Sequence, residues 1–228
     1  MRLGLLSDIH GNAGALDVAL RNSKCDLYLV CGDIVGYYYE TKEVLALLSK
    51  VRFSFVRGNH EVMLQNLRQN PNLNDSIVKV YGTSLLQALQ LLDSKELDFL
   101  CHSKDTDTLK IGKTEISFSH GSPWKIDEYI YPDSEKTIWP KFLSYGEQIF
   151  VIGNTHHQMI KRFKDKLIIN PGSIGQSRTD PGMAQWAELD TENLDLTFKS
   201  VPYDTSRILK SCEKYDPENL SLQKALTP

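Results

Sequence analysis

The chain has 228 residues, of which 41% are hydrophobic and 24% are charged, and its formal net charge is −3. This composition is typical of a globular protein with a substantial core, and so small a charge gives no general attraction to nucleic acids or anionic membranes. No apolar run is long enough for a membrane span or a signal peptide, and the four cysteines are scattered without Cys-X-X-Cys spacing, so we expect a cytoplasmic location.

Strand and helix patterns alternate in the first part of the chain. Apolar runs predict three buried strands, at residues 2–7, 26–31 and 51–56. Helices are predicted at 13–22, with Asn12 as the N-cap, and at 41–48. Strands separated by helices indicate crossover connections and a parallel sheet.

Residues 61–101 are predicted to be helical. Apolar residues between Ile77 and Leu92 follow the 3.6-residue period, and Asp93 with Glu96 resembles a capping box.

Strand patterns dominate the rest of the chain. Residues 106–111 and 114–119 flank Gly112-Lys113, which predicts a hairpin. Further strands are predicted at residues 149–152, 159–163, 166–169, 184–189 and 194–201. Residues 121–133 read as an ordered aromatic loop, and a helix near 206–212 precedes a polar tail. Because no repeat or linker interrupts the pattern, we expect one domain over residues 1–228.

Polar residues follow five of these strands, at the end where ligand sites form in α/β sheets. The five segments are Asp8-Ile9-His10, Gly32-Asp33, Gly58-Asn59-His60-Glu61, His120-Gly121 and Gly153-Asn154-Thr155-His156. One such segment is more often a loop cap or a core histidine than a ligand set, but five together indicate a common site. Aspartate, histidine and asparagine without thiolates suit manganese, iron or zinc, and two ions sharing a carboxylate fit the number of ligands better than one.

In order and strand context, this series resembles the calcineurin-like metallophosphoesterase superfamily. The segments Ser119–Pro123, Glu128-Tyr129 and Asn170–Arg178 also resemble its compact branch of YfcE-like and diadenosine-tetraphosphatase-like phosphoesterases. The resemblance implies an α/β (α+β) four-layer αββα sandwich, in which two mixed sheets lie between outer helices and the site lies at one edge.

The resemblance also implies a set of metal ligands, carried over by position. Asp8, His10 and His156 would bind one ion, Asp33 would bridge both, and Asn59 with His120 would bind the second. The ions would be divalent: manganese first, with iron, zinc or nickel as alternatives. A hydroxide bridging the metals, which lie about 3.5–4 Å apart in such sites, would attack phosphorus in line.

A further set of residues is expected to serve the substrate. His60 would lie over the phosphate as charge stabiliser or general acid, with Glu61 orienting its ring. Asn59, His60 and Arg178 are candidate substrate-binding residues, and Arg178 would reach a second phosphate.

The chain departs from the family pattern at Asn154, where the usual Gly-His-X-His has its first histidine. An amide oxygen is a weaker ligand than an imidazole, so we expect a looser second metal site that favours an oxygen-tolerant ion such as manganese. The neighbouring His157 is the less favoured substitute, because an adjacent side chain usually points elsewhere.

The sequence thus predicts a metal-dependent phosphoester hydrolase, either a phosphatase or a phosphodiesterase. Its substrate would be a phosphorylated small molecule or a nucleotide, including nucleotide polyphosphates such as diadenosine tetraphosphate. The alternative is a metal-poor, catalytically weak scaffold or binding module on the same fold. The presence of Asp33, Asn59, His60 and the whole first-metal set argues against it. The oligomeric state stays open, as does whether the tyrosines at 37–39, Trp124, Tyr129 and Tyr131 stack on a leaving group or only pack together.

Overall fold

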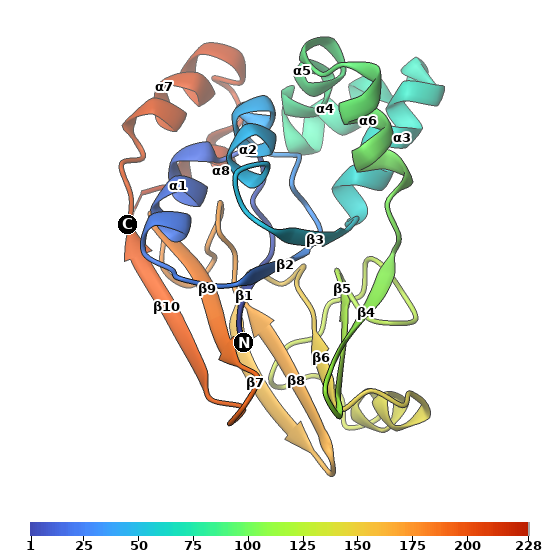
Figure 1. Ribbon diagram of the computed structural model, residues 1–228. Coiled ribbons are helices and arrows are strands. Elements are labelled where there is room, and N and C mark those ends of the chain that lie inside the picture. Colours follow the sequence, from blue (N-terminus) through green and yellow to red (C-terminus); the bar gives the residue numbers. More distant parts are fainter. Residues whose placement is uncertain (228) are drawn as a thin grey trace.

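The computed structural model describes residues 1–227 and contains two five-stranded sheets (Figure 1). The first sheet contains β1 (Arg2–Leu6), β2 (Leu27–Cys31), β3 (Phe53–Val56), β9 (Met183–Asp190) and β10 (Leu196–Pro202). The second contains β4 (Thr106–Ile111), β5 (Thr114–Ser119), β6 (Ile149–Val151), β7 (Gln158–Phe163) and β8 (Lys166–Pro171). The strand orders are β10-β9-β1-β2-β3 and β4-β5-β6-β8-β7.

Both sheets are mixed. In the first, β1, β2 and β3 run parallel, and β9 lies antiparallel to β1. In the second, β5, β6 and β8 run parallel, while β4 and β7 are antiparallel edge strands. The predicted arrangement of two mixed sheets flanked by helices is therefore confirmed.

The helices form in the order α1 to α8. Their bounds are α1 (Ala13–Arg21), α2 (Thr41–Leu48), α3 (Asn59–Gln69), α4 (Asn74–Tyr81), α5 (Ser84–Leu91), α6 (Ser94–His102), α7 (Ser206–Tyr215) and α8 (Leu220–Lys224). Two 3₁₀-helices, η1 (Pro71–Leu73) and η2 (Trp139–Ser144), complete the set. Figure 1 shows the α-helices gathered in the upper half of the view, with the second sheet below them.

Alternation along the buried strands separates the core into layers. Leu3 and Leu5 of β1 point between the sheets, where they join Phe118 and Val151 of the second sheet, whereas Leu6 points to the helices. A third apolar cluster, which includes Phe142 of η2, covers the outer face of the second sheet. The two sheets therefore pack face to face. Helices cover the outer face of the first sheet, and the cluster around η2 covers the outer face of the second.

Two features differ from the sequence prediction. The periodic apolar stretch from Ile77 to Leu92 does not form one helix, because Gly82 adopts φ 79° and ends α4. Val80, one of the apolar residues in this periodic stretch and therefore expected to be buried, is 58% exposed. The polar tail contains a further helix, α8, which the sequence pattern did not predict. Leu222 is its buried residue, and a single buried residue produces no helical periodicity.

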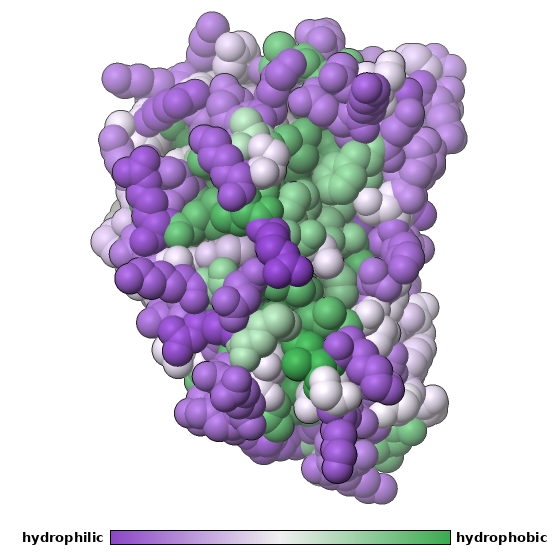
Figure 2. All heavy atoms as spheres, in the orientation of Figure 1, coloured by the Kyte–Doolittle hydropathy of each residue, from purple (hydrophilic) through white to green (hydrophobic). Residues whose placement is uncertain are grey.

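Apolar side chains gather down the middle of the face drawn in Figure 2, over the region of α2 and β3. A groove there is lined by Leu45, Ala46, Phe53 and Phe99, with lysines and a glutamate beside them. Within residues 1–227, no helix combines the length and the apolar character needed to cross a membrane.

Candidate metal centre

The polar segments predicted from the sequence meet where the carboxyl ends of both sheets come together. Asp8 and His10 follow β1, Asp33 follows β2, and Asn59 begins α3 just after β3. His120 follows β5, and His156 lies in the loop between β6 and β7. The parallel strands of each sheet thus deliver these side chains to one shared edge, and those of Asp8, His10, Asp33, His120 and His156 are all at most 3% exposed.

The backbone at this edge is held in an unusual conformation. Asp8, His10, Asp33, Asn154 and His156 all have positive φ, between 51° and 66°. Non-glycine residues seldom adopt this region, and such residues cluster at functional sites. Backbone bonds from Asp8 to Gly32 (3.2 Å) and from His10 to Asp33 (2.9 Å) hold the first two loops together. The loops are therefore shaped to point side chains inward.

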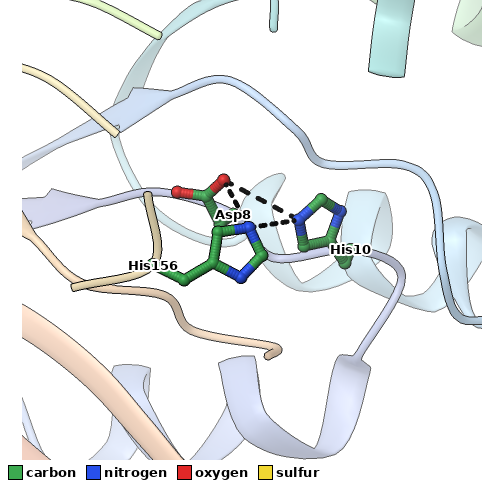
Figure 3. A group of neighbouring side chains, drawn as sticks. All are labelled: Asp8, His10 and His156. Carbon is green, nitrogen blue, oxygen red and sulfur yellow. Dashed lines mark hydrogen bonds and ion pairs between the residues drawn. The ribbon is translucent and has the colours of Figure 1, made fainter. Parts of the chain in front are cut away.

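Asp8, His10 and His156 form the first cluster (Figure 3). The Nε2 atoms of the two histidines lie 3.1 Å apart, and Nε2 of His156 lies 3.2 Å from Oδ1 of Asp8. Each ring donates from Nδ1 to a backbone carbonyl, His10 to Val35 (3.1 Å) and His156 to Gln176 (2.6 Å). Because a carbonyl only accepts, a neutral ring has its Nε2 lone pair directed into the cluster.

This arrangement fits a cation. Two imidazole lone pairs facing each other repel, and Oδ1 of Asp8 is buried without a hydrogen-bond partner among the described residues 1–227. An ion between these atoms would satisfy all three.

Asp33, His120 and Asn59 form the second cluster. His120 donates from Nδ1 to the Cys31 carbonyl at 2.8 Å, and its Nε2 lies 3.2 Å from Oδ2 of Asp33 and 2.8 Å from Oδ1 of Asn59. The same Asp33 oxygen lies 3.8 Å from Nε2 of His10. Asp33 therefore stands between the two clusters, in the place that a bridging carboxylate needs.

A close backbone approach makes room for His120. Gly32 adopts φ 81°, and a Cβ atom there would lie 2.6 Å from Nδ1 of His120. Any other residue at this position would push the ring away from Asp33.

The buried charges at this edge shift one another's pKa values. Burial raises the pKa of Asp8, but His156 and His120 together outweigh burial and lower it to about 2. Burial lowers the pKa of His120, but Asp33 raises it to about 10. With its pKa raised, His120 carries a proton when no metal is bound, so metal binding at its Nε2 competes with that proton and weakens at low pH.

Glu61 does not do what the sequence suggested. Its buried carboxylate accepts backbone N–H bonds from Gly58 (2.7 Å), Asp33 (2.9 Å) and Val35 (3.1 Å). Burial and Asp33 raise its pKa to about 7, against the effect of these three bonds. The prediction that Glu61 orients the His60 ring is wrong, because the carboxylate is turned to the backbone and fixes the loop that carries Asp33.

Asn154 is held at the edge of the site. Its backbone N–H donates to Oδ2 of Asp8 at 3.1 Å, and its side-chain Nδ2 donates to the Glu128 carbonyl at 3.1 Å. Within residues 1–227, no hydrogen bond joins it to Asn59 or His120, so its role as a ligand stays a prediction. His157 turns its Nδ1 to the Thr155 carbonyl and packs on Tyr131, away from both clusters.

Arg178 is an exposed residue near Tyr37 and Tyr129. Partial burial lowers its pKa, whereas Tyr37, Tyr129 and Asp8 raise it above the ordinary value. The guanidinium therefore lies among tyrosines rather than in the metal clusters.

Several functional contacts had no sequence signal. The carbonyls of Cys31, Val35 and Gln176 orient the rings of the candidate ligand histidines through backbone atoms, which any residue supplies. Tyr81 packs against His60 from a helix that carries no motif.

The sequence model of the calcineurin-like phosphoesterase superfamily domain matches residues 1–193. An uncharacterized protein of Methanocaldococcus jannaschii is 28% identical over 232 residues, covering 93% of this chain and 90% of that protein.

Two solved structures have a similar fold. A metallophosphoesterase from Sphaerobacter thermophilus gives a TM-score of 0.80 at 22% identity, covering 100% of both chains. A hypothetical protein from Pyrococcus horikoshii gives a TM-score of 0.75 at 23% identity, covering 99% of this chain and 94% of that one. The resemblance read from the motifs is thereby confirmed.

Proposed function

Because the chain belongs to the calcineurin-like phosphoesterase superfamily, we propose that it hydrolyses phosphoesters with two divalent metal ions held by the two clusters. The observation that carries the proposal is that buried carboxylate and imidazole atoms lie close together and face one another. Oδ1 of Asp8 and the Nε2 atoms of His10 and His156 face one point, and Asp33 links that point to His120 and Asn59.

Each residue then has a definite task. Asp8, His10 and His156 would hold the first ion, Asn59 and His120 the second, and Asp33 would touch both. The ions would supply the charge that steadies the attacking and leaving oxygens of an in-line displacement. The carbonyls behind the three ligating histidines keep the rings in the tautomer that can bind metal.

His60 would act on the substrate. Its Nε2 lies 3.9 Å from Oδ2 of Asp33, so a phosphate held by the ions that Asp33 would touch would lie within its reach. It would stabilise the phosphoryl charge or protonate the leaving oxygen. Asn59 would help to bind that phosphate, and Arg178 would bind a second phosphate where the substrate has one.

We propose manganese as the preferred ion and a phosphomonoester, phosphodiester or nucleotide polyphosphate as the substrate. We also propose a cytoplasmic location, which suits the four free cysteines of this chain.

A substrate panel tests this function. The purified protein, supplemented with manganese, would be assayed with p-nitrophenyl phosphate, bis-p-nitrophenyl phosphate and diadenosine tetraphosphate. We expect turnover of at least one of them that a chelator abolishes and that His60→Ala lowers about 10²- to 10⁴-fold. No turnover of any substrate, together with no bound metal, would contradict the proposal and favour the scaffold alternative.

Asn154→His is expected to tighten the second metal site by about tenfold, because imidazole replaces an amide as the nearby donor. Histidine tolerates the positive φ of 66° at this position better than most residues do. The affinity for the second manganese ion would be measured by calorimetric titration of wild type and variant. Equal affinities in the two proteins would show that Asn154 has no part in the second site.

A further inference from the structure

His60 differs from the three histidines that donate from Nδ1 to a carbonyl. Its side chain is buried, yet its Nδ1 has no hydrogen-bond partner within residues 1–227. A Cβ atom at Gly36 would collide with Nδ1, so the Gly36 backbone covers this nitrogen directly. No hydrogen bond from Nδ1 therefore fixes the orientation of the ring.

Aromatic rings surround His60 instead. Tyr81 meets it edge to face, with centroids 5.0 Å apart and an interplanar angle of 80°. Tyr37 lies 4.9 Å away at 43°, and the two tyrosine rings are 5.8 Å apart. His10 closes the group at 4.9 Å and 69°. Aromatic rings attract one another at such separations and tilts, so these rings define the position of the imidazole.

The backbone holds both tyrosines in place. Tyr37 adopts φ 52° in a tight turn in which the Tyr38 N–H donates to the Gly36 carbonyl at 2.6 Å. A bulky residue rarely adopts this conformation, and such strain is found where a side chain is held for function. Tyr81 is the last residue of α4, and the next turn is anchored where Thr83 donates to Asp216 at 2.9 Å.

We propose that Tyr81 and Tyr37 are positioning residues, whose rings hold the His60 imidazole in its working orientation. This inference rests on the proposed function, because it presumes that His60 serves phosphoester hydrolysis. Tyr81 is the better residue to substitute, because the ring of Tyr37 also packs on the candidate ligand His10, with centroids 4.6 Å apart. Misplacing a reacting group by about 1 Å can cost about 10²-fold in rate.

Tyr81→Leu and Tyr81→Phe separate the ring from its hydroxyl. With manganese-loaded protein and phenyl phosphate, a substrate with a poor leaving group, we expect Tyr81→Leu to lower kcat about 10- to 100-fold. The loss should be smaller with p-nitrophenyl phosphate, and KM should stay near the wild-type value. Tyr81→Phe keeps the ring and should retain activity, as should Tyr145→Leu, a matched control at the end of η2 where a partly buried tyrosine packs on Trp124 and Phe150.

Coupling to His60 supplies the decisive readout. In a His60→Ala background, Tyr81→Leu should cause no further loss, because its effect passes through the missing ring. Crystal structures of the two variants should show the His60 ring turned from its wild-type orientation in Tyr81→Leu and unchanged in Tyr81→Phe. An equal loss in both backgrounds, or a Phe variant as impaired as the Leu variant, would overturn the proposal.

Folding is checked by thermal unfolding of each variant, and Tyr81→Met takes the place of Tyr81→Leu should the latter not fold. An active wild type with an unimpaired Tyr81→Leu variant would overturn the positioning role alone. A wild type inactive on every phosphoester would instead overturn the proposed function, and this inference with it.

Discussion

Asp33→Asn is expected to lower kcat/KM by about 10³-fold or more, which corresponds to about 4 kcal/mol of transition-state stabilisation. The reason is the place of this carboxylate between the clusters. Its Oδ2 lies 3.2 Å from Nε2 of His120 and 3.8 Å from Nε2 of His10. Its Oδ1 accepts a hydrogen bond from the backbone N–H of His60 at 3.0 Å. Asparagine keeps the shape but removes the charge, and an amide presents only one oxygen.

The measurement is steady-state kinetics with manganese, alongside the metal content of the same preparation. Asp165→Asn is the matched control, because Asp165 is 70% exposed in the turn between β7 and β8. Wild-type activity in Asp33→Asn would show that the carboxylate charge is not needed and that the bridging role is wrong.

Glu61→Gln is expected to destabilise the fold by about 3 kcal/mol, because a buried N–H donor left without an acceptor costs about 1–3 kcal/mol. The glutamate accepts three backbone N–H bonds, and one glutamine oxygen cannot serve all three donors. The glutamine NH₂ group would also face an N–H donor. For a chain of this size, the melting temperature should fall by about 10 °C.

Thermal unfolding at pH 8, above the pKa of about 7 for Glu61, gives the comparison with the carboxylate ionised. Glu96→Gln is the control: Glu96 caps α6 by accepting the exposed Asp93 N–H at 2.8 Å, and its loss should cost under about 1 kcal/mol. Similar melting temperatures for Glu61→Gln and wild type would contradict the anchoring role.

Much of the architecture could be read from local patterns. The apolar runs that became β1, β2 and β3 and the hairpin of β4 and β5 all formed, and the Asp93 capping box is present. The polar residues after the strands share an edge because parallel strands end on the same side. That geometric rule is why a ligand set could be proposed from the sequence.

Other features depend on contacts between distant parts of the chain. The insertion of β9 between β10 and β1 is set by pairing across more than half of the sequence. The break at Gly82 is stabilised by Asp216, which no window around α4 contains. Sequence adjacency suggested that Glu61 pairs with His60. Its buried carboxylate instead points to three backbone N–H groups that need an acceptor.

Metal stoichiometry tests the central claim most directly. The protein would be stripped with a chelator, reloaded with manganese, freed of excess ion and analysed by elemental mass spectrometry. We predict two ions per chain in the wild type, with the second, more weakly bound ion lost at higher free manganese than the first. A chain that binds no manganese, or that hydrolyses phosphoesters at full rate with a single ion, would contradict the two-metal site.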